Sequence, residues 1–108
     1  MMTLEGKARV VIVLVSECYD VPVEDILSIQ KTARVFRPRH VAMYLCRNDV
    51  LMSFPAIGRL FVRDNSTVQN GCGQIRRALK KEPKLVGVIA ALRSRYAECM
   101  QEGALAVA

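Results

Sequence analysis

Apolar side chains recur at helical spacing along most of the chain and divide it into amphipathic segments. The clearest stripe repeats at i, i+4, i+7 and i+11 and consists of Val68, Cys72, Ile75 and Leu79. This spacing keeps all four side chains on one face of a helix that we expect to run to about residue 81, where Glu82-Pro83 breaks it. A second stripe predicts a last helix over about 84–100 and consists of Leu85, Val88, Ile89, Leu92, Tyr96 and Cys99.

The first segment, residues 7–18, allows two interpretations. Val10 to Val15 has the β-branched content of a buried strand, whereas the same segment also fits helical spacing. The apolar positions at that spacing are Ala8, Val11, Ile12, Val15 and Cys18. We choose the helix. Residues 1–6 and 101–108 are expected to be flexible ends of a single domain that covers residues 1–108.

Prolines mark the starts of three further helices. Pro22 opens a short helix over about 22–28 with two acids in its first turn, where the helix dipole favours them. The stretch "IQKTARVF" that follows lacks a consistent period and is expected to be a basic loop. Pro38 then begins a third helix over about 38–48. Ser53 can cap a fourth helix that carries Pro55 in its first turn and ends near Phe61.

The fourth and fifth helices, joined by the four residues "VRDN", have the arrangement of a helix-turn-helix. With the apolar stripe buried, the outward positions of the fifth helix are Ser66, Gln69, Asn70, Gly73, Arg76, Arg77 and Lys80. Hydroxyls and amides near its amino end can hydrogen-bond base edges, and the cations further along can contact phosphate. The expected fold is therefore all-α, with six helices.

Positive charge is concentrated in the middle of the chain. The formal net charge is +6, but residues 26–81 alone carry eleven bases against two acids, a net of +9. Such a distribution favours binding to a polyanion. A solvated basic face without a partner is the alternative.

The stretch "RDNSTV" gathers short hydrogen-bonding side chains at the start of the fifth helix. Asp64, Asn65, Ser66 and Thr67 are residue types that cap helices. At the leading tip of a recognition helix the same groups would face base edges. Plain capping, in which one residue acts and the others are merely exposed, is the simpler interpretation, and the surrounding basic residues favour DNA.

Other classes of function find little support. The four cysteines stand 26 to 28 residues apart without C-x-x-C spacing, so neither a zinc site nor a disulfide framework is indicated. The apolar run "VVIVLV" is too short to cross a bilayer, which needs about 20 residues. His40, the sole histidine, lies among cations and has no evident catalytic partner. We expect a cytoplasmic, nucleoid-associated protein without enzymatic activity, cofactor, metal, membrane contact or small-molecule substrate.

Four blocks of residues, in order, resemble one family over about residues 7–100. "VEDILS" is similar to V-x-D-L-L-S, "RPRHVAMYLCRND" to R-P-R-Q-x-A-M-Y-L-A-R-E-L, "SFPAIGRLF" to S-L-P-E-I-G-x-x-F, and "RDNSTVQNGC" to R-D-H-T-T-V-x-H-A-C. These are motifs of the C-terminal DNA-binding domain (domain IV) of the bacterial chromosomal replication initiator DnaA. The resemblance implies a TrpR-like six-helix domain that reads a DnaA box in double-stranded DNA.

The resemblance also implies a role for individual residues. Major-groove readers would be Asp64, Asn65, Ser66 and Thr67, with Lys31 in the minor groove and Pro55 against a sugar edge or thymine methyl. Phosphate contacts would fall to Arg37, Arg39, His40 and Arg47. The basic character of the helix-turn-helix adds Arg63, Arg76 and Arg77 to the phosphate-contacting set. Other replication proteins are further candidate partners.

The chain departs from the family at the turn and in the fifth helix. The family's F-G-G-R-D is here Phe61-Val62-Arg63-Asp64, one residue shorter and without glycine. Asn65 replaces the signature histidine, which predicts a changed base preference. Gly71 and Gly73 replace residues that favour helix, at about 1 kcal/mol each relative to alanine.

Two functions follow as hypotheses. The sequence lacks the G-x-x-x-x-G-K-[ST] phosphate loop of the initiator's ATP-binding motor, so we expect a stand-alone reader of DnaA-box-like sites that regulates replication initiation or transcription. The alternative is an initiator-derived protein-interaction module with weak or non-specific DNA binding. The two glycines, the shortened turn and Gln74, which lies where the family often has a phosphate-contacting lysine, favour the alternative. Five retained family residues oppose it: Arg37, Pro38, Arg39, Asp64 and Thr67.

Overall fold

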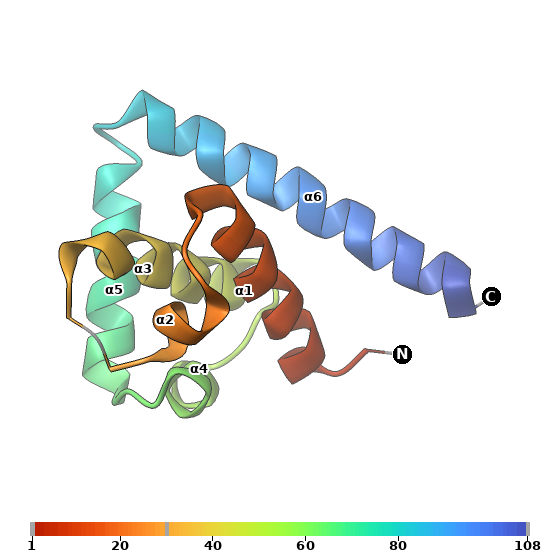
Figure 1. Ribbon diagram of the computed structural model, residues 1–108, viewed down its shortest axis with the longest axis horizontal. Helices are drawn as coiled ribbons and strands as arrows, with labels where there is room; N and C mark the ends of the chain where they lie inside the picture. The colour runs from red at the N-terminus through yellow and green to blue at the C-terminus, as the bar shows by residue number, and fades with distance from the viewer. Residues whose placement is uncertain (1, 30, 108) are drawn as a thin grey trace.

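The predicted all-α architecture is confirmed. A computed structural model of the chain describes residues 2–29 and 31–107, with side chains in the last helix up to Glu102. The described residues form six helices and no strand (Figure 1). The helices are α1 (Leu4–Tyr19), α2 (Val23–Leu27), α3 (Ala33–Asn48), α4 (Phe54–Phe61), α5 (Asn65–Ala78) and α6 (Pro83–Val107).

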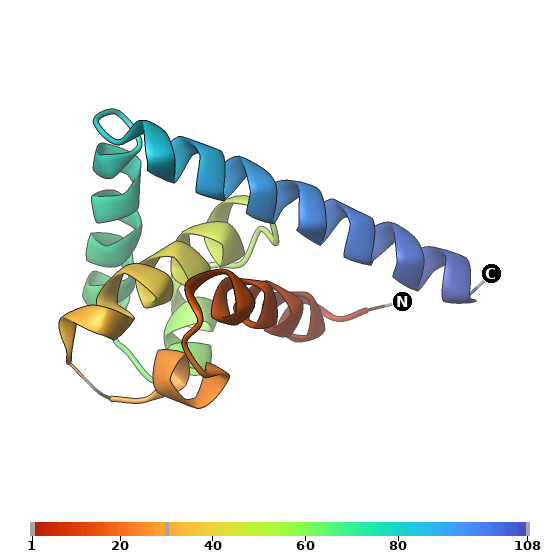
Figure 2. The same ribbon diagram turned by 45° about the horizontal axis from the view of Figure 1, so that its top comes forward.

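Helix α3 occupies the centre of the molecule. It packs against α1, α2, α4 and α5, while α6 lies along α1 and extends past it (Figures 1 and 2). The turn between α4 and α5 and the connection between α2 and α3 lie at the same end of the molecule. This common end contains the residues for which the sequence predicts base contacts.

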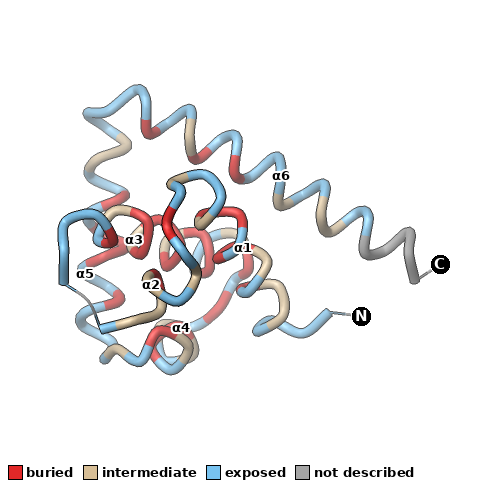
Figure 3. Tube along the Cα trace, in the orientation of Figure 1, coloured by how far each residue is buried: buried red, intermediate tan, exposed pale blue. Residues whose placement is uncertain are grey.

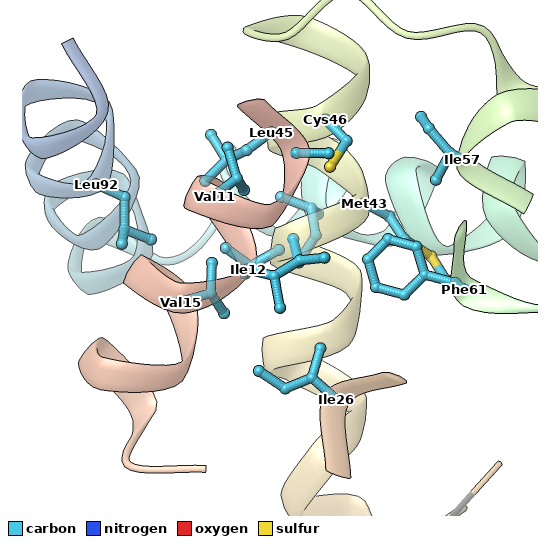
Figure 4. Packing of buried hydrophobic residues seen from close by; sticks show 14 of the residues in the cluster. Val11, Ile12, Val15, Ile26, Met43, Leu45, Cys46, Ile57, Phe61 and Leu92 are labelled. Carbon is cyan, nitrogen blue, oxygen red and sulfur yellow. The ribbon is translucent and has the colours of Figure 1, made fainter. Parts of the chain in front are cut away.

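The core is built from apolar residues of every helix. Figure 4 shows Val11 of α1 beside Leu45 of α3, and Phe61 of α4 beside Met43 of α3. All four side chains are at most 3% exposed. Buried aliphatic and aromatic side chains each contribute about 1.5–3 kcal/mol to folding, so this cluster holds α1, α3 and α4 together.

Two cysteines belong to this core. Burial raises the pKa of Cys46 to about 12 and that of Cys72 to about 11. Both therefore stay protonated near neutral pH and act as small apolar side chains.

Helix α3 begins earlier than the sequence predicts. Residues 33–36, the second half of the stretch expected to be a basic loop, are helical, and Pro38 lies inside the helix. Pro38 lacks an N–H and so removes a backbone hydrogen bond. The full burial of Val35 offsets this cost, because a loop would leave that side chain outside the core.

Helix extends into both ends of the chain. Residues expected to be flexible are helical at both ends: α1 starts at Leu4, where the Thr3 hydroxyl accepts a hydrogen bond of 3.0 Å from the Gly6 N–H, and α6 runs to Val107. Met1, Gln30 and Ala108 lie outside the described residues.

The turn of the helix-turn-helix consists of Val62, Arg63 and Asp64, because Asn65 is already helical. Val62 takes the left-handed conformation (φ 54°, ψ 54°) in which glycine is usual, and the Arg63 N–H then donates to the Gly58 carbonyl at 2.8 Å. A Cβ on Gly58 would lie only 2.5 Å from the Arg63 carbonyl oxygen. Gly58 thus permits the close approach of the turn, and Val62 bears the conformational strain.

The glycines of α5 differ in their surroundings. A Cβ on Gly71 would lie 2.8 Å from Cδ2 of His40 on α3, so this glycine permits the close packing of the two helices. A Cβ on Gly73 would meet only the ends of two arginine side chains, Arg77 at 3.1 Å and Arg76 at 3.6 Å. Arg77 is exposed and can move away.

We expect Val62→Gly to raise the free energy of unfolding by about 1 kcal/mol. The left-handed conformation costs a non-glycine residue about 1–2 kcal/mol, and Val62 is 74% exposed, so little packing is lost. Chemical denaturation monitored by circular dichroism measures the change. A fall in stability would show that the turn does not strain Val62.

We expect Gly73→Ala to stabilise the protein by up to about 1 kcal/mol, the difference in helix propensity between the two residues. Gly71→Ala is the matched control in the same helix. It should destabilise, because the added methyl displaces the His40 ring and opens the α3–α5 packing. Equal effects of the two substitutions in thermal unfolding would contradict this distinction.

Candidate nucleic-acid interface

The amino end of α5 is a polar, solvent-exposed tip (Figure 3). Asp64 caps the helix: its Oδ1 accepts hydrogen bonds from the Thr67 N–H at 3.0 Å and from the Ser66 hydroxyl at 3.1 Å. Hydrogen bonds from Thr67 and Ser66 lower the pKa of Asp64, which keeps the carboxylate ionised. The capping predicted from "RDNSTV" is therefore present and falls to Asp64.

Asn65 differs from its neighbours at this tip. It is exposed at the first position of α5 and makes no side-chain hydrogen bond within the described part of the chain. An asparagine amide offers both a donor and an acceptor, the combination that pairs with the major-groove edge of adenine. Of the four predicted readers, Asn65 is thus the one whose side chain is fully available.

The two other predicted base-contacting residues flank the tip. Pro55 is exposed in the first turn of α4, whose Ser53 cap accepts a hydrogen bond of 3.2 Å from the Ala56 N–H. Lys31 is exposed in the connection between α2 and α3. A hydrogen bond of 2.8 Å from Arg63 to the Ser28 carbonyl joins this connection to the turn before α5.

Arg76 and Arg77 are exposed in the last turn of α5, where the helix dipole favours cations. Neither forms an ion pair among the residues that the structure describes. Gly73, which the helical pattern places outward, is instead buried, and both arginine side chains lie close to it. The outward face of α5 therefore changes from amides and hydroxyls to guanidinium groups towards its carboxyl end.

Arg39 is buried, whereas the phosphate contact predicted for it requires an exposed side chain. Its side chain is only 4% exposed, and it donates to the backbone carbonyls of Ile26 (2.8 Å), Ser28 (3.0 Å) and Asp25 (3.1 Å). Burial lowers the pKa of Arg39, and the nearby charge of Arg63 adds to this effect. The structure thus places Arg39 inside the fold, where it holds α2 against α3.

Arg37 is half-exposed but already paired. Its two Nη atoms donate to the Glu82 carboxylate at 3.0 and 3.1 Å. The pair raises the pKa of Arg37 and lowers that of Glu82. Sequence reasoning missed Glu82, because it lies 45 residues away and precedes a proline that seemed only to end a helix.

Arg47 and His40 combine surface position with internal contacts. The Arg47 guanidinium stacks 4.2 Å from the centre of the Phe54 ring and donates to the Met52 carbonyl. These two contacts hold the segment that leads from α3 into α4. Burial lowers the pKa of His40, as do Arg39 and Arg37, so the ring is neutral near pH 7. His40 could therefore donate one hydrogen bond to a phosphate, but as a neutral ring.

Among the described residues, no three His, Cys, Asp or Glu side chains gather as metal ligands would. None of the described helices is both long enough and apolar enough to span a bilayer.

Comparison with known proteins supports the family resemblance. Residues 8–75, which include the helix-turn-helix, match the family described as bacterial dnaA protein helix-turn-helix. The chain is 38% identical over 79 residues to the chromosomal replication initiator protein DnaA 2 of Protochlamydia amoebophila, and 38% identical over 86 residues to DnaA of Rhodopseudomonas palustris strain TIE-1. These alignments cover 73% and 79% of the chain but only 18% of each relative.

A solved structure shares the fold. The crystal structure of a DNA replication initiation factor superimposes with a TM-score of 0.77 and 30% sequence identity, over 86% of this chain and 29% of the other. The family match over residues 8–75 and the structural match thus indicate the same family. The chain belongs to the bacterial DnaA helix-turn-helix family.

Proposed function

We propose that the chain binds double-stranded DNA with sequence preference by placing the amino end of α5 in a major groove, at sites resembling a DnaA box. The observation that carries this proposal is the exposed tip of α5, where Asn65 is available beside a rigidly capped turn. Membership of the DnaA helix-turn-helix family supports it. Through such sites the protein would regulate replication initiation or transcription.

The contacts divide by the chemistry of each side chain. Asn65, Ser66 and Thr67 face base edges, and the Asp64 carboxylate is suited to accept from a cytosine amino group. Pro55 lies against a sugar edge or thymine methyl, and Lys31 enters the adjacent minor groove. Phosphate contacts fall to the exposed cations of the same surface, Arg47, Arg76 and Arg77, with His40 and Arg37 at its edge.

A polar recognition tip distinguishes this function from protein interaction. The centre of a protein–protein interface is usually apolar and poor in charge, whereas residues 64–67 and 69–70 are all exposed and polar. Selection of binding sites from a random pool of duplexes is the direct test. We expect one enriched sequence, to be compared with a DnaA box; enrichment of none would favour an initiator-derived interaction module.

We expect Asn65→Ala and Thr67→Ala each to cost about 1–3 kcal/mol on the preferred duplex and to relax preference at one or two base pairs. Both residues are exposed and the backbone cap on Asp64 remains, so stability should change little. Ser94→Ala, an exposed substitution on α6, is the matched control. Fluorescence anisotropy with single-base variants of the duplex measures the effect. An unchanged base preference would show that neither residue contacts base edges.

We expect Arg76→Ala and Arg77→Ala to weaken binding to every duplex alike. Each lost phosphate contact should reduce the slope of log K against log salt by about 0.9. Titrations over a range of salt concentrations, with the preferred and a scrambled duplex, measure this slope. A change in base preference, with the slope unaltered, would assign the two arginines to readout.

A further inference from the structure

Arg63 lies between the two elements that would contact DNA. It follows Val62 in the turn before α5, and its side chain reaches the carboxyl end of α2, 35 residues earlier in the chain. We infer that Arg63 is a positioning residue that locks the α2–α3 connection to the helix-turn-helix and so sets Lys31 relative to the tip of α5. This inference rests on the proposed function for its DNA consequence, but not for its structural one.

The guanidinium of Arg63 bridges two pieces of backbone. Its Nη2 donates to the Ser28 carbonyl at 2.8 Å, while its Nη1 donates to the Phe61 carbonyl at 2.9 Å and to the Val62 carbonyl at 3.3 Å. One planar group therefore satisfies the end of α4 and the end of α2 together. A lysine has the same charge but lacks this fork of donors.

The Ser28 carbonyl accepts from two arginines that approach from different sides. Arg39 reaches it from within the fold at 3.0 Å, and the half-buried Arg63 reaches it from the turn. The last carbonyls of a helix have no partner within the helix, and these guanidinium groups supply donors to them. Two cations placed side by side repel, so this arrangement is maintained by the Ser28 carbonyl that they share and by the further carbonyls that each arginine meets.

Helix α2 depends on such external support. It has only five residues, too few to be stable by itself. Ser28 caps its carboxyl end and Lys31 follows three positions later. Loss of the Arg63 bridge would thus loosen the link between the helix-turn-helix and the segment that carries Lys31, while Arg39, which also holds the Ser28 carbonyl, and the buried Ile26 retain α2 itself.

The sequence suggested another role for Arg63, contact with phosphate. The two roles predict different effects of the substitution Arg63→Lys. If Arg63 contacts phosphate, Arg63→Lys keeps most of the affinity, because the charge remains. If Arg63 positions the α2–α3 connection, Arg63→Lys loses affinity for DNA, because lysine lacks the fork of donors.

Limited digestion with trypsin tests the structural part without DNA. Local proteolysis follows the population of the open segment. We expect Arg63→Lys to speed cleavage after Lys31 by about tenfold, with cleavage after the buried Arg39 unchanged. Arg59→Lys, an exposed substitution on α4, should leave both rates as in the unmodified protein. Cleavage after Lys31 at the original rate, or equal acceleration at Arg39 from global unfolding, would overturn the inference.

A double-mutant cycle on the selected duplex tests the DNA part. Lys31→Ala should weaken binding about tenfold in the unmodified protein and by less than about twofold in Arg63→Lys, because the lysine is already displaced. Additive losses, or retained affinity in Arg63→Lys, would overturn the positioning role.

The two proposals can fail separately. If the unmodified protein binds all duplexes equally, the proposed function is wrong, and the trypsin experiment still decides whether Arg63 holds the connection. If the protein selects a duplex but the cycle is additive, the proposed function stands and the role of Arg63 is wrong.

Discussion

The packing of one face of α5 on α3 fixes how the molecule presents its polar surface. Val68, Cys72 and Ile75 are at most 3% exposed, and Gly71 allows the α3 side chains to approach closely. Because a helix is a rigid cylinder, burying this face determines which residues point outward. The exposed tip, its cap and the arginines beyond it all follow from that contact, and removal of the α3 surface would leave α5 without a defined orientation.

Elements with a strong helical period could be predicted from the sequence, and those shaped by distant contacts could not. The stripes of α5 and α6 predicted both helices, although α5 ends at Ala78 and not near residue 81, and the ambiguous first segment is a helix as chosen. The predicted start of α3 was wrong because the proline, Pro38, was taken by a local rule to mark the first turn of the helix. Burial of Val35 outweighs that rule, and burial is a property of the folded chain. The length of α6 was underestimated because its last turns lack the apolar stripe.

The candidate site divides in the same way. The polar tip could be identified because its residues are consecutive and one of them, Asp64, caps the helix. The arginines could only be counted, because their partners lie far away in sequence: backbone carbonyls of α2 for Arg39, and the Ser28 carbonyl for Arg63. A net charge of +9 over residues 26–81 therefore overstates how many cations are free to meet a polyanion.

The ion pair between Arg37 and Glu82 alters what Arg37 can offer to a duplex. With both Nη atoms on one carboxylate, the pair is electrically neutral as a unit. A phosphate can reach this guanidinium only by exchange with the resident anion, and a neutral pair displaces few of the cations condensed on DNA. A contact between Arg37 and a phosphate would therefore help to orient the protein on the duplex, but it would contribute little to the dependence of binding on ionic strength.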